Sequence, residues 1–264
     1  MLTKREKELL EGVELSFMFT IDAERDHCPH GKTYHGMTML PHALDFCTDH
    51  EITATVFCTG DIARKFPDIL KEVAKNHEVG CHMDHHEPLV PNEYDNRVIS
   101  QQHAERALRA ATEALRAVAN PLCFRAPYLA FDDRFIPSLI HHGYHVSSSV
   151  PASHSRGLAV MGEITEVCVS ASLSLNPLLE YHVFSLENLM LRGDSLLRGL
   201  FDLLILKYCT VPMLPVVFLC HSWELTTSAL CAIRAMLDTF PDTMRFDTVS
   251  GFSRNLHESL KARL

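Results

Sequence analysis

Hydrophobic and polar residues alternate most regularly near the start of the chain. From Val13 to Asp22 every second residue is apolar, and the residues between them, apart from Met18, are polar. A period of two is typical of a β-strand with one apolar face. If this geometry continues past the strand, Glu24 lies on the same face as Asp22.

Beyond this strand the pattern switches repeatedly between short β-branched runs and longer amphipathic segments. The predicted strands are 13–22, 52–59, 77–82, 122–125, 144–150, 214–220 and 244–249. The predicted helices are 36–50, 61–76, 93–118, 133–141, 224–240 and 252–262. Alternation of this length indicates a parallel sheet and favours an α/β barrel. With no linker-like stretch and no internal repeat, we expect one domain over residues 1–264, with its core at about 13–256.

The segment from Gly157 to Leu191 is less regular than the rest, and its elements are the least predictable. We expect it to carry specificity if it forms a loop over the mouth of the barrel.

Ionisable residues stand at or just beyond the ends of four predicted strands. They are Asp22, His82, Arg125 and His221. In α/β barrels the chemistry is built at the C-terminal ends of the strands and in the loops that follow. Histidines scattered through a core are not expected to share this placement, so the set predicts a functional site.

A divalent metal fits one part of this set. His82 and His86 can bind a metal through neutral imidazole nitrogens, and Asp22 completes a face of two histidines and one carboxylate. The pair alone is weak support, because a chain with 17 histidines contains such a spacing by chance. Surface or capping histidines, and a turn cap for Asp22, are the structural alternatives.

The remaining candidates suit proton transfer and charge stabilisation. Glu24 supplies a second carboxylate that can take a proton while the first holds a metal. Arg125 can keep a catalytic carboxylate ionised, or form a structural salt bridge. His221 can protonate a leaving amine, or be a core histidine bonded to a carbonyl. Pro127 fixes the backbone so that the amide of Tyr128 can face an oxyanion.

Composition narrows the class of protein. The 264 residues are 47% apolar, enough for a full core, and the net charge of −9 argues against a nucleic-acid groove. The nine cysteines are odd in number and irregularly spaced, which argues against a disulfide framework. Residues 1–8 are charged and lack the apolar region of a secretory signal, and the apolar run 195–206 is too short to span a bilayer. We therefore expect a soluble cytoplasmic protein with reduced thiols.

Five segments, taken in order, resemble the polysaccharide deacetylase family, carbohydrate esterase family 4. They are 52–60 with 77–88 (similar to "aTFF…G…HEIGxHxxxH"), 124–128 (the third motif), 143–150 ("GYxYDSSV"), 219–224 ("LHPWE") and 246–252 (the closing strand and helix). The resemblance covers roughly residues 13–256. It implies a distorted (β/α) barrel and hydrolysis of an N-acyl group, typically acetyl, from an amino sugar or related small amide.

The resemblance also implies roles for the candidate residues. Asp22, His82 and His86 would be the metal ligands, for Zn²⁺ or else Co²⁺ or Ni²⁺. His221 would be the general acid, Arg125 would tune the base, and the Tyr128 backbone would be an oxyanion donor.

The position of the base is open, because the first motif of the family usually carries two acids. Pairing Thr20 with Asp22 leaves no base within the motif, so that Glu24 would have to supply it. Pairing Asp22 with Glu24 makes Asp22 the base and Glu24 a metal ligand.

Two other functions stay open at this point. Relatives with similar motifs open cyclic amides or imides, and a non-catalytic metal- or sugar-binding protein would explain Thr20 in place of an acid. Against pure binding, Glu24 and His221 add proton-transfer groups that a binding site does not need. The expected partner is a small-molecule or glycan substrate, such as a nucleotide- or lipid-linked intermediate, with no nucleic acid and no transmembrane segment; a homo-oligomer is compatible with the sequence.

Overall fold

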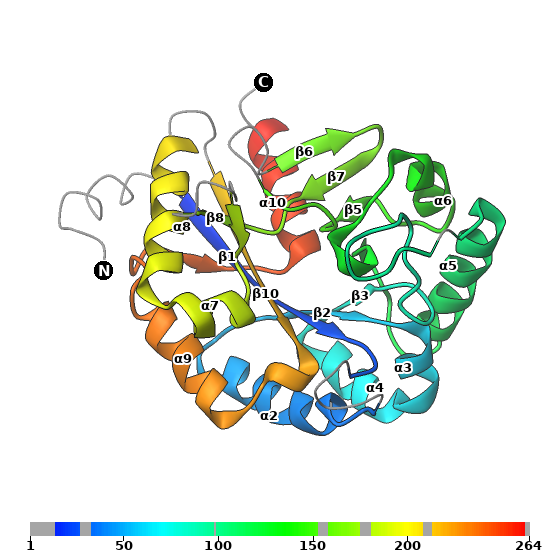
Figure 1. Ribbon diagram of the computed structural model, residues 1–264, viewed down its shortest axis with the longest axis horizontal. Coiled ribbons are helices and arrows are strands. Elements are labelled where there is room, and N and C mark those ends of the chain that lie inside the picture. The colour runs from blue at the N-terminus through cyan, green and yellow to red at the C-terminus, as the bar shows by residue number, and fades with distance from the viewer. Residues whose placement is uncertain are drawn as a thin grey trace.

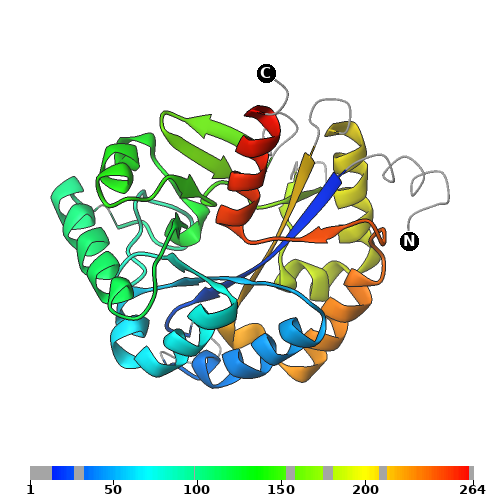
Figure 2. The ribbon, with the colours of Figure 1, turned by 180° about the vertical axis from the view of Figure 1, so that it is seen from behind.

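The computed structural model describes residues 14–26, 33–97, 99–152, 158–174, 181–207 and 213–261. A curved sheet occupies the centre, and helices follow one another around its outer side (Figures 1 and 2). The strands are β1 (Glu14–Ala23), β2 (Thr55–Cys58), β3 (Glu78–Cys81), β4 (Cys123–Phe124), β5 (Val146–Ser147), β6 (Leu158–Met161), β7 (Ile164–Val167), β8 (Ala171–Leu173), β9 (Tyr181–Val183), β10 (Met213–His221) and β11 (Arg245–Phe246).

The helices connect successive strands. The α-helices are α2 (Gly36–Asp49), α3 (Gly60–Lys65), α4 (Pro67–Asn76), α5 (Gln101–Arg116), α6 (Ile136–His141), α7 (Leu186–Arg192), α8 (Asp194–Lys207), α9 (Thr227–Leu237) and α10 (Val249–Lys261). Three 3₁₀ turns are η1 (Pro127–Leu129), η2 (Asp133–Phe135) and η3 (Ser222–Glu224).

The main sheet is parallel from β10 to β7. Its order is β10-β1-β2-β3-β4-β5-β7-β6, and β11 pairs with the start of β1. Only β6 runs antiparallel to its neighbour in this part of the chain, and β8 and β9 form a separate antiparallel pair. The alternation of strands and helices around a strongly curved parallel sheet is the distorted (β/α) barrel that the sequence predicts.

The ring nearly closes through irregular backbone between β5 and β10. On one side, Val169 N–H donates to Val150 O at 3.0 Å and Ala152 N–H donates to Val169 O at 2.7 Å. On the other, Ser170 N–H donates to Val217 O at 3.1 Å. Val169 and Ser170 therefore form hydrogen bonds both with the backbone that follows β5 and with β10, whose backbone groups would otherwise lack these partners.

Both faces of the sheet are buried, and they differ in chemistry. The alternating apolar face of β1, including Phe17, Phe19 and Ile21, packs into the large core beneath the helices. The other face of β1 points into the barrel, where Met18 joins a second core with Val217 and side chains of β2 and β4. The polar residues near the end of β1 therefore lie inside the barrel, above this inner core.

Several predicted boundaries are wrong for identifiable reasons. The helix expected over 93–118 begins at Gln101, where the Ser100 hydroxyl accepts a hydrogen bond from His103 N–H at 3.2 Å and caps the first turn. The helix expected over 61–76 is divided into α3 and α4, because Pro67 cannot donate the backbone hydrogen bond that continuation requires. The helix expected over 224–240 begins at Thr227, after the 3₁₀ turn η3.

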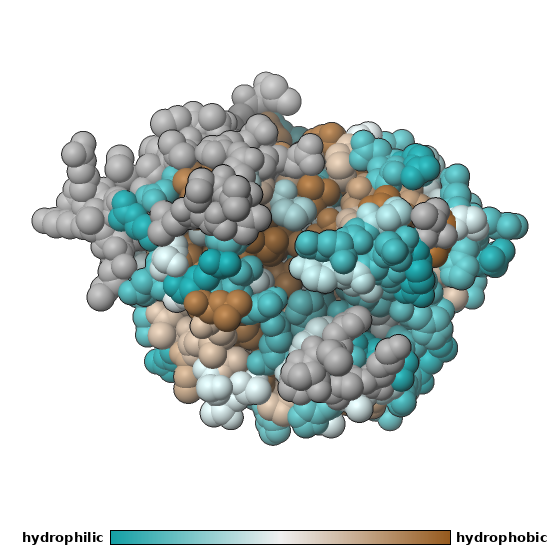
Figure 3. Space-filling model, viewed as in Figure 1, coloured by the Kyte–Doolittle hydropathy of each residue, from teal (hydrophilic) through white to brown (hydrophobic). Residues whose placement is uncertain are grey.

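The surface is mixed in character. Figure 3 shows hydrophobic residues gathered near the middle of one face, and hydrophilic residues over the helices to its right. A further hydrophobic spot lies over α7, where Met190 is 55% and Leu191 is 72% exposed. Within the described ranges, no helix combines the length and the apolar character needed to cross a membrane.

Candidate active site

The ends of four parallel strands bring the candidate residues to one edge of the sheet. Asp22 on β1 is in register with His221, the last residue of β10. His82 directly follows β3, and Arg125 directly follows β4. Parallel strands place their C-terminal ends at the same edge, so side chains as far apart in the sequence as Asp22 and His221 meet there.

The orientation of His82 is set by the main chain of the neighbouring strand. Its Nδ1 lies 2.8 Å from Arg125 O, which requires Nδ1 to carry the proton. Nε2 is buried and has no hydrogen-bond partner within the described residues. Burial lowers the pKa of His82 to about 4, against the opposing charge of Asp22, so the ring is neutral at pH 7. A neutral imidazole with a bare, buried Nε2 is the form that binds a metal.

His86 and Glu24 face His82. The His86 Nε2 lies 2.7 Å from Glu24 Oε2, and the rings of His82 and His86 have their centroids 4.9 Å apart. His86 adopts a φ of +61°, which is uncommon for a residue with a side chain. The turn is held by Glu87, whose Oε2 accepts from the N–H groups of Asp84 and His85 at 3.1 and 2.9 Å.

Asp22 is engaged by Arg125. The Arg125 Nη1 donates to Asp22 Oδ1 at 2.8 Å and to Thr20 Oγ1 at 2.9 Å, and both charged side chains are almost completely buried. The second oxygen of Asp22 lies 3.9 Å from His82 Nε2. Arg125 is itself fixed by Ser148, whose carbonyl and hydroxyl oxygens accept from Nε and Nη2 at 2.8 and 3.0 Å. This arrangement pairs the Asp22 carboxyl group with a fixed guanidinium and sets its orientation.

His221 ends β10, and Arg125 follows β4; in the order of the sheet these two strands lie on opposite sides of β1, which carries Asp22. The His221 Nδ1 lies 3.1 Å from Glu224 Oε2, and its ring stacks on Trp223 with centroids 4.5 Å apart. Burial acts to lower the pKa of His221, but the hydrogen bond and charge of Glu224, with the charges of Glu24 and Asp22, raise it to about 9. The imidazole is therefore protonated at pH 7 in this environment.

Tyr128 follows Arg125 in a strained turn. It lies in η1 with φ +61° and ψ 12°, and Leu129 beside it also has a positive φ. Strain of this kind persists where the surrounding structure enforces it, and it concentrates at functional sites. The ring of Tyr128 packs against that of His86, with centroids 4.4 Å apart.

A metal ion fits this group of side chains. Among the described residues, one set of three potential ligands has its donor atoms within 4.8 Å of one another: Glu24, His82 and His86. Two imidazole nitrogens and one carboxylate are a donor set typical of catalytic Zn²⁺ and other divalent metals. Asp22 is next to this set but is held by Arg125.

The structure thus brings all seven predicted residues to one edge of the sheet, in two groups. Glu24, His82 and His86 form the group that can bind a metal, and Asp22 pairs with Arg125. His221 and Tyr128 stand at the border of the site.

Sequence reasoning missed two supporting residues, Glu224 and Ser148. The spacing of His221 and Glu224, three residues apart at the start of a helical turn, is the signal of a capping box and was available in the sequence.

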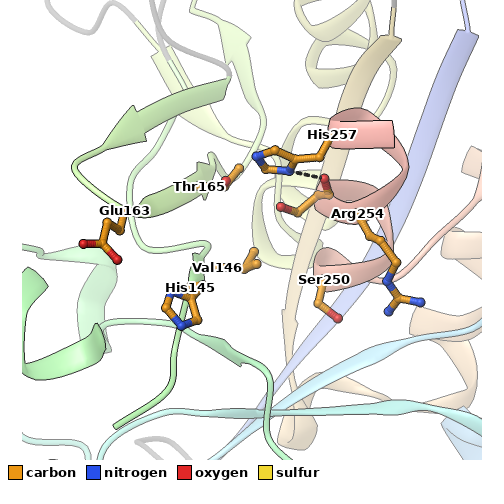
Figure 4. Close-up of a pocket in the computed structure, with 8 residues that line it drawn as sticks. His145, Val146, Glu163, Thr165, Ser250, Arg254 and His257 are labelled. Carbon is orange, nitrogen blue, oxygen red and sulfur yellow. Dashed lines mark hydrogen bonds between the residues drawn. The ribbon is translucent and has the colours of Figure 1, made fainter. Parts of the chain in front are cut away.

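A separate pocket lies at the opposite ends of the strands (Figure 4). It has a volume of about 290 Å³ and is bordered by residues that precede or begin β5 and β7, such as His145 and Glu163, and by α10. In it, His257 Nδ1 donates to Ser253 O at 2.7 Å. None of the seven candidate residues lines this pocket.

Comparison of the sequence with family profiles gives a match over residues 26–147 to the family described as polysaccharide deacetylase. This match confirms that the chain resembles the polysaccharide deacetylase family. The matched region contains His82, His86, Arg125 and Tyr128, whereas β1 with Asp22 and Glu24 precedes it. A search of curated proteins finds no match to the sequence.

Solved structures share the fold at low sequence identity. A protein described as a polysaccharide deacetylase from Mycobacterium smegmatis superimposes with a TM-score of 0.69 at 17% identity, covering 94% of this chain and 92% of that one. The allantoinase Puue gives 0.67 at 12% identity, with the same two coverages. A pseudoenzyme of carbohydrate esterase family 4 from Bacillus anthracis gives 0.52 at 14%, covering 89% of this chain and 68% of that one. At these identities the likeness shows the fold alone.

Proposed function

We propose that the chain is a metal-dependent hydrolase that removes an N-acyl group, typically acetyl, from an amino sugar. The observation that carries this proposal is the bare Nε2 of buried His82, which faces Glu24 and His86 beside an arginine-bound Asp22. The match of residues 26–147 to the polysaccharide deacetylase family supports the same reaction class. Zn²⁺ is the ion that the donor set favours, with Co²⁺ or Ni²⁺ as alternatives.

Glu24, His82 and His86 would hold the ion. A divalent ion bound there would supply Lewis-acid polarisation of the amide carbonyl and lower the pKa of a water molecule. Of the two assignments that the sequence left open, we favour the one with Glu24 as ligand and Asp22 as base. The reason is that Arg125 already occupies one oxygen of Asp22, whereas both histidines converge on Glu24.

Asp22 would then accept a proton from the attacking water. The ion pair with Arg125 orients Asp22 through Oδ1, and Oδ2, which faces His82, would accept the proton. Thr20 does not compete for this role, because its hydroxyl donates to Phe218 O at 2.7 Å and accepts from Arg125. The threonine in place of an acid is therefore compatible with an enzyme.

His221 would donate the proton that releases the amine. With Nδ1 bonded to Glu224, the protonated ring retains an Nε2–H group for the leaving nitrogen. The amide of Tyr128, in its fixed turn, would stabilise the oxyanion that forms at the carbonyl carbon. A base and an acid on different strands give the two proton transfers that amide hydrolysis needs.

Hydrolysis of a cyclic amide is the second candidate reaction. The likeness to the allantoinase Puue favours it, since the fold accommodates ring opening. A non-catalytic binding role is the third candidate function, because the same fold occurs in a pseudoenzyme of carbohydrate esterase family 4. His221 with its raised pKa argues for catalysis over simple binding.

The decisive assay compares two product classes on zinc-reconstituted protein. We expect acetate release from N-acetylglucosamine or its short oligomers, and no loss of allantoin or hydantoin. His221→Ala should keep its metal and lose most of the turnover, while Leu122→Ala, at the far end of β4, should behave as wild type. Ring opening without acetate release would show that cyclic amides are the substrates. Unchanged turnover in His221→Ala would exclude His221 as the general acid.

A further inference from the structure

The start of helix α2 is held by a carboxylate from the end of β1 and not by a residue of the helix itself. His35, at the N-cap position, forms no side-chain capping hydrogen bond, and the first turn contains no acidic residue. Asp26 instead accepts from the N–H groups of His35 and Gly36, at 2.6 Å on Oδ2 and 3.0 Å on Oδ1. This buried aspartate therefore satisfies two of the N–H groups that a helix leaves without partners at its N-terminus.

Asp26 is also fixed by the loop that leads into the helix. Its N–H group donates to Thr33 O at 2.9 Å, and the Thr33 hydroxyl donates to Oδ2 at 2.5 Å. Asp26 lies two residues beyond Glu24, where the chain leaves β1. The end of the strand that carries Asp22 and Glu24 is therefore tied to the start of α2.

At the same point α2 contacts η3, the turn that follows His221. A Cβ added to Gly36 would lie 2.5 Å from Ser222 Oγ and 2.7 Å from Trp223 N, so glycine is required for this close approach. Ser222 is fully buried, and among the described residues its hydroxyl has no hydrogen-bond partner. Packing against Gly36, rather than a side-chain hydrogen bond of Ser222, therefore fixes the turn on the helix.

The turn η3 carries the two side chains that surround the imidazole of His221. Glu224 Oε2 accepts from His221 N–H at 2.6 Å and lies 3.1 Å from Nδ1, and Trp223 stacks on the ring. The backbone of His221 is held by the pairing of β10 with β1, whereas Trp223 and Glu224 lie beyond the strand. A displacement of η3 would therefore move Glu224 and Trp223 relative to an imidazole that stays on its strand.

We propose that Asp26 and Gly36 are positioning residues for the general acid His221. Asp26 holds the start of α2, and Gly36 allows η3 to rest on it, so that the turn keeps its side chains against the imidazole. This inference rests on the proposed function, because it takes His221 as the general acid. Asp26 and Gly36 act through η3 and are not catalytic residues.

The first test uses Trp223, the single tryptophan of the chain, whose fluorescence reports on η3 without a substrate. In Gly36→Ala the turn must move to admit the methyl group, although alanine favours the helix more than glycine does. We expect a red-shifted emission maximum and stronger quenching by acrylamide, because the indole leaves its place against His221. Gly251→Ala is the matched control: its Cβ would lie 2.3 Å from Asp247 Oδ1 at the start of α10, and it should leave the emission unchanged. Emission of Gly36→Ala identical to that of wild type would overturn the proposal.

Acetate release from N-acetylglucosamine oligomers shows whether the contact acts through His221. Gly36→Ala should retain its zinc and lose kcat roughly tenfold to a hundredfold, the usual effect of a misplaced catalytic group. In a His221→Ala background the same substitution should have little further effect, because residues that act as a unit are not additive. Loss of zinc in Gly36→Ala, or a full additional loss of kcat in the double variant, would overturn the proposal.

Two substitutions of Asp26 test the other half of the contact. Asp26→Ala removes both acceptors from the start of α2, whereas Asp26→Asn retains one side-chain oxygen and should recover part of the turnover and of the Trp223 emission. Ser100→Ala, which removes the cap of α5, is the control. If wild type hydrolyses none of the oligomers, the proposed function fails, but a change of emission in both Gly36→Ala and Asp26→Ala would still support the positioning of the turn. Unchanged emission in Asp26→Ala would exclude Asp26 from this role.

Discussion

The imidazole of His221 carries a charge that its neighbours impose. Its pKa of about 9, against an ordinary 6.5, comes mainly from Glu224, which overcomes the opposing effect of burial. A raised pKa means that the proton is present in neutral solution and is lost as the pH rises through the folded value. As the proposed acid, His221 should therefore limit activity on the alkaline side.

Replacing Glu224 by Gln should shift this alkaline limb to lower pH. The amide retains a hydrogen-bond acceptor but removes the charge that stabilises the imidazolium. The pH dependence of kcat/KM for acetate release measures the shift, and Glu258→Gln on the exposed face of α10 serves as the control. An alkaline limb at the same pH in Glu224→Gln and wild type would show that His221 is not the acid.

Gly60, the first residue of α3, lies close to the loop between His82 and His86 and to α5. A Cβ at this position would lie 2.1 Å from Asp84 Oδ1 and 2.8 Å from the Cα of Ala111. The backbone N–H of Gly60 also donates to Met83 O, in the loop between His82 and His86. The glycine therefore holds the histidine loop close to β2.

Gly60→Ala should lower the free energy of unfolding by about 1–3 kcal/mol, the usual cost of overpacking. It should also weaken metal binding, because Asp84 and its loop must move. Chemical denaturation and a zinc titration measure the two effects. Gly193→Ala is the comparison, since nothing lies within 4 Å of its added Cβ and only its φ of +49° is unfavourable. Zinc affinity as strong as that of wild type would show that the loop does not depend on Gly60.

At the scale of elements, the side chain of Glu166 on β7 provides hydrogen-bond acceptors just beyond the end of β5, where the backbone pairing of β5 with β7 stops. Its Oε1 accepts from the N–H groups of Ser149 and Val150 at 2.7 and 2.9 Å, just beyond the end of β5. Ser149 Oγ in turn accepts from Ala126 N–H at 2.8 Å, next to Arg125. The fully buried carboxyl group thus replaces a strand partner and supports the segment that fixes Arg125.

Glu166→Ala should destabilise the fold by about 1–3 kcal/mol, because two buried N–H groups lose their acceptor. Glu166→Gln keeps an acceptor oxygen and removes a buried carboxyl whose pKa burial raises, so it should cost less. Denaturant unfolding of both variants measures the difference. Equal losses for Ala and Gln would indicate that the carboxylate charge, rather than the acceptor oxygen, matters.

The elements that the sequence predicts well are those with strong local patterns. The alternation expected over 13–22 matches β1 from Glu14 onward, with Val13 outside the described residues, and the helix expected over 36–50 matches α2. The start of α5 is an exception: residues 93–97 do not form the expected helix, because the Asn92 side chain accepts hydrogen bonds from the N–H groups of Tyr94 and Asp95 and forms a turn there. Local polar contacts of this kind override periodicity.

The roles of the two acids are not readable from sequence for a different reason. Asp22 and Glu24 share one strand face, and only the guanidinium of Arg125, 103 positions later, distinguishes them. Such a contact depends on the register of the whole sheet, which a short motif does not encode.

At the scale of the molecule, the barrel brings the candidate residues from distant parts of the sequence together at the C-terminal edge of its parallel strands. The irregular segment 157–191 supplies strands β6 to β9 and the start of α7, except for Gly157 and 175–180, which lie outside the described residues. Its expected role in specificity stays a prediction.

The central claim is that Glu24, with His82 and His86, binds the metal while Asp22 serves as base. Elemental analysis of zinc-reconstituted wild type, Glu24→Gln and Asp22→Asn tests it most directly, with acetate release measured on the same samples. We expect about one zinc per chain in wild type and in Asp22→Asn, and little in Glu24→Gln, with activity lost in both variants by roughly a hundredfold or more. Zinc retained in Glu24→Gln and lost in Asp22→Asn would exchange the two roles, and wild type without bound metal would contradict the proposed hydrolase.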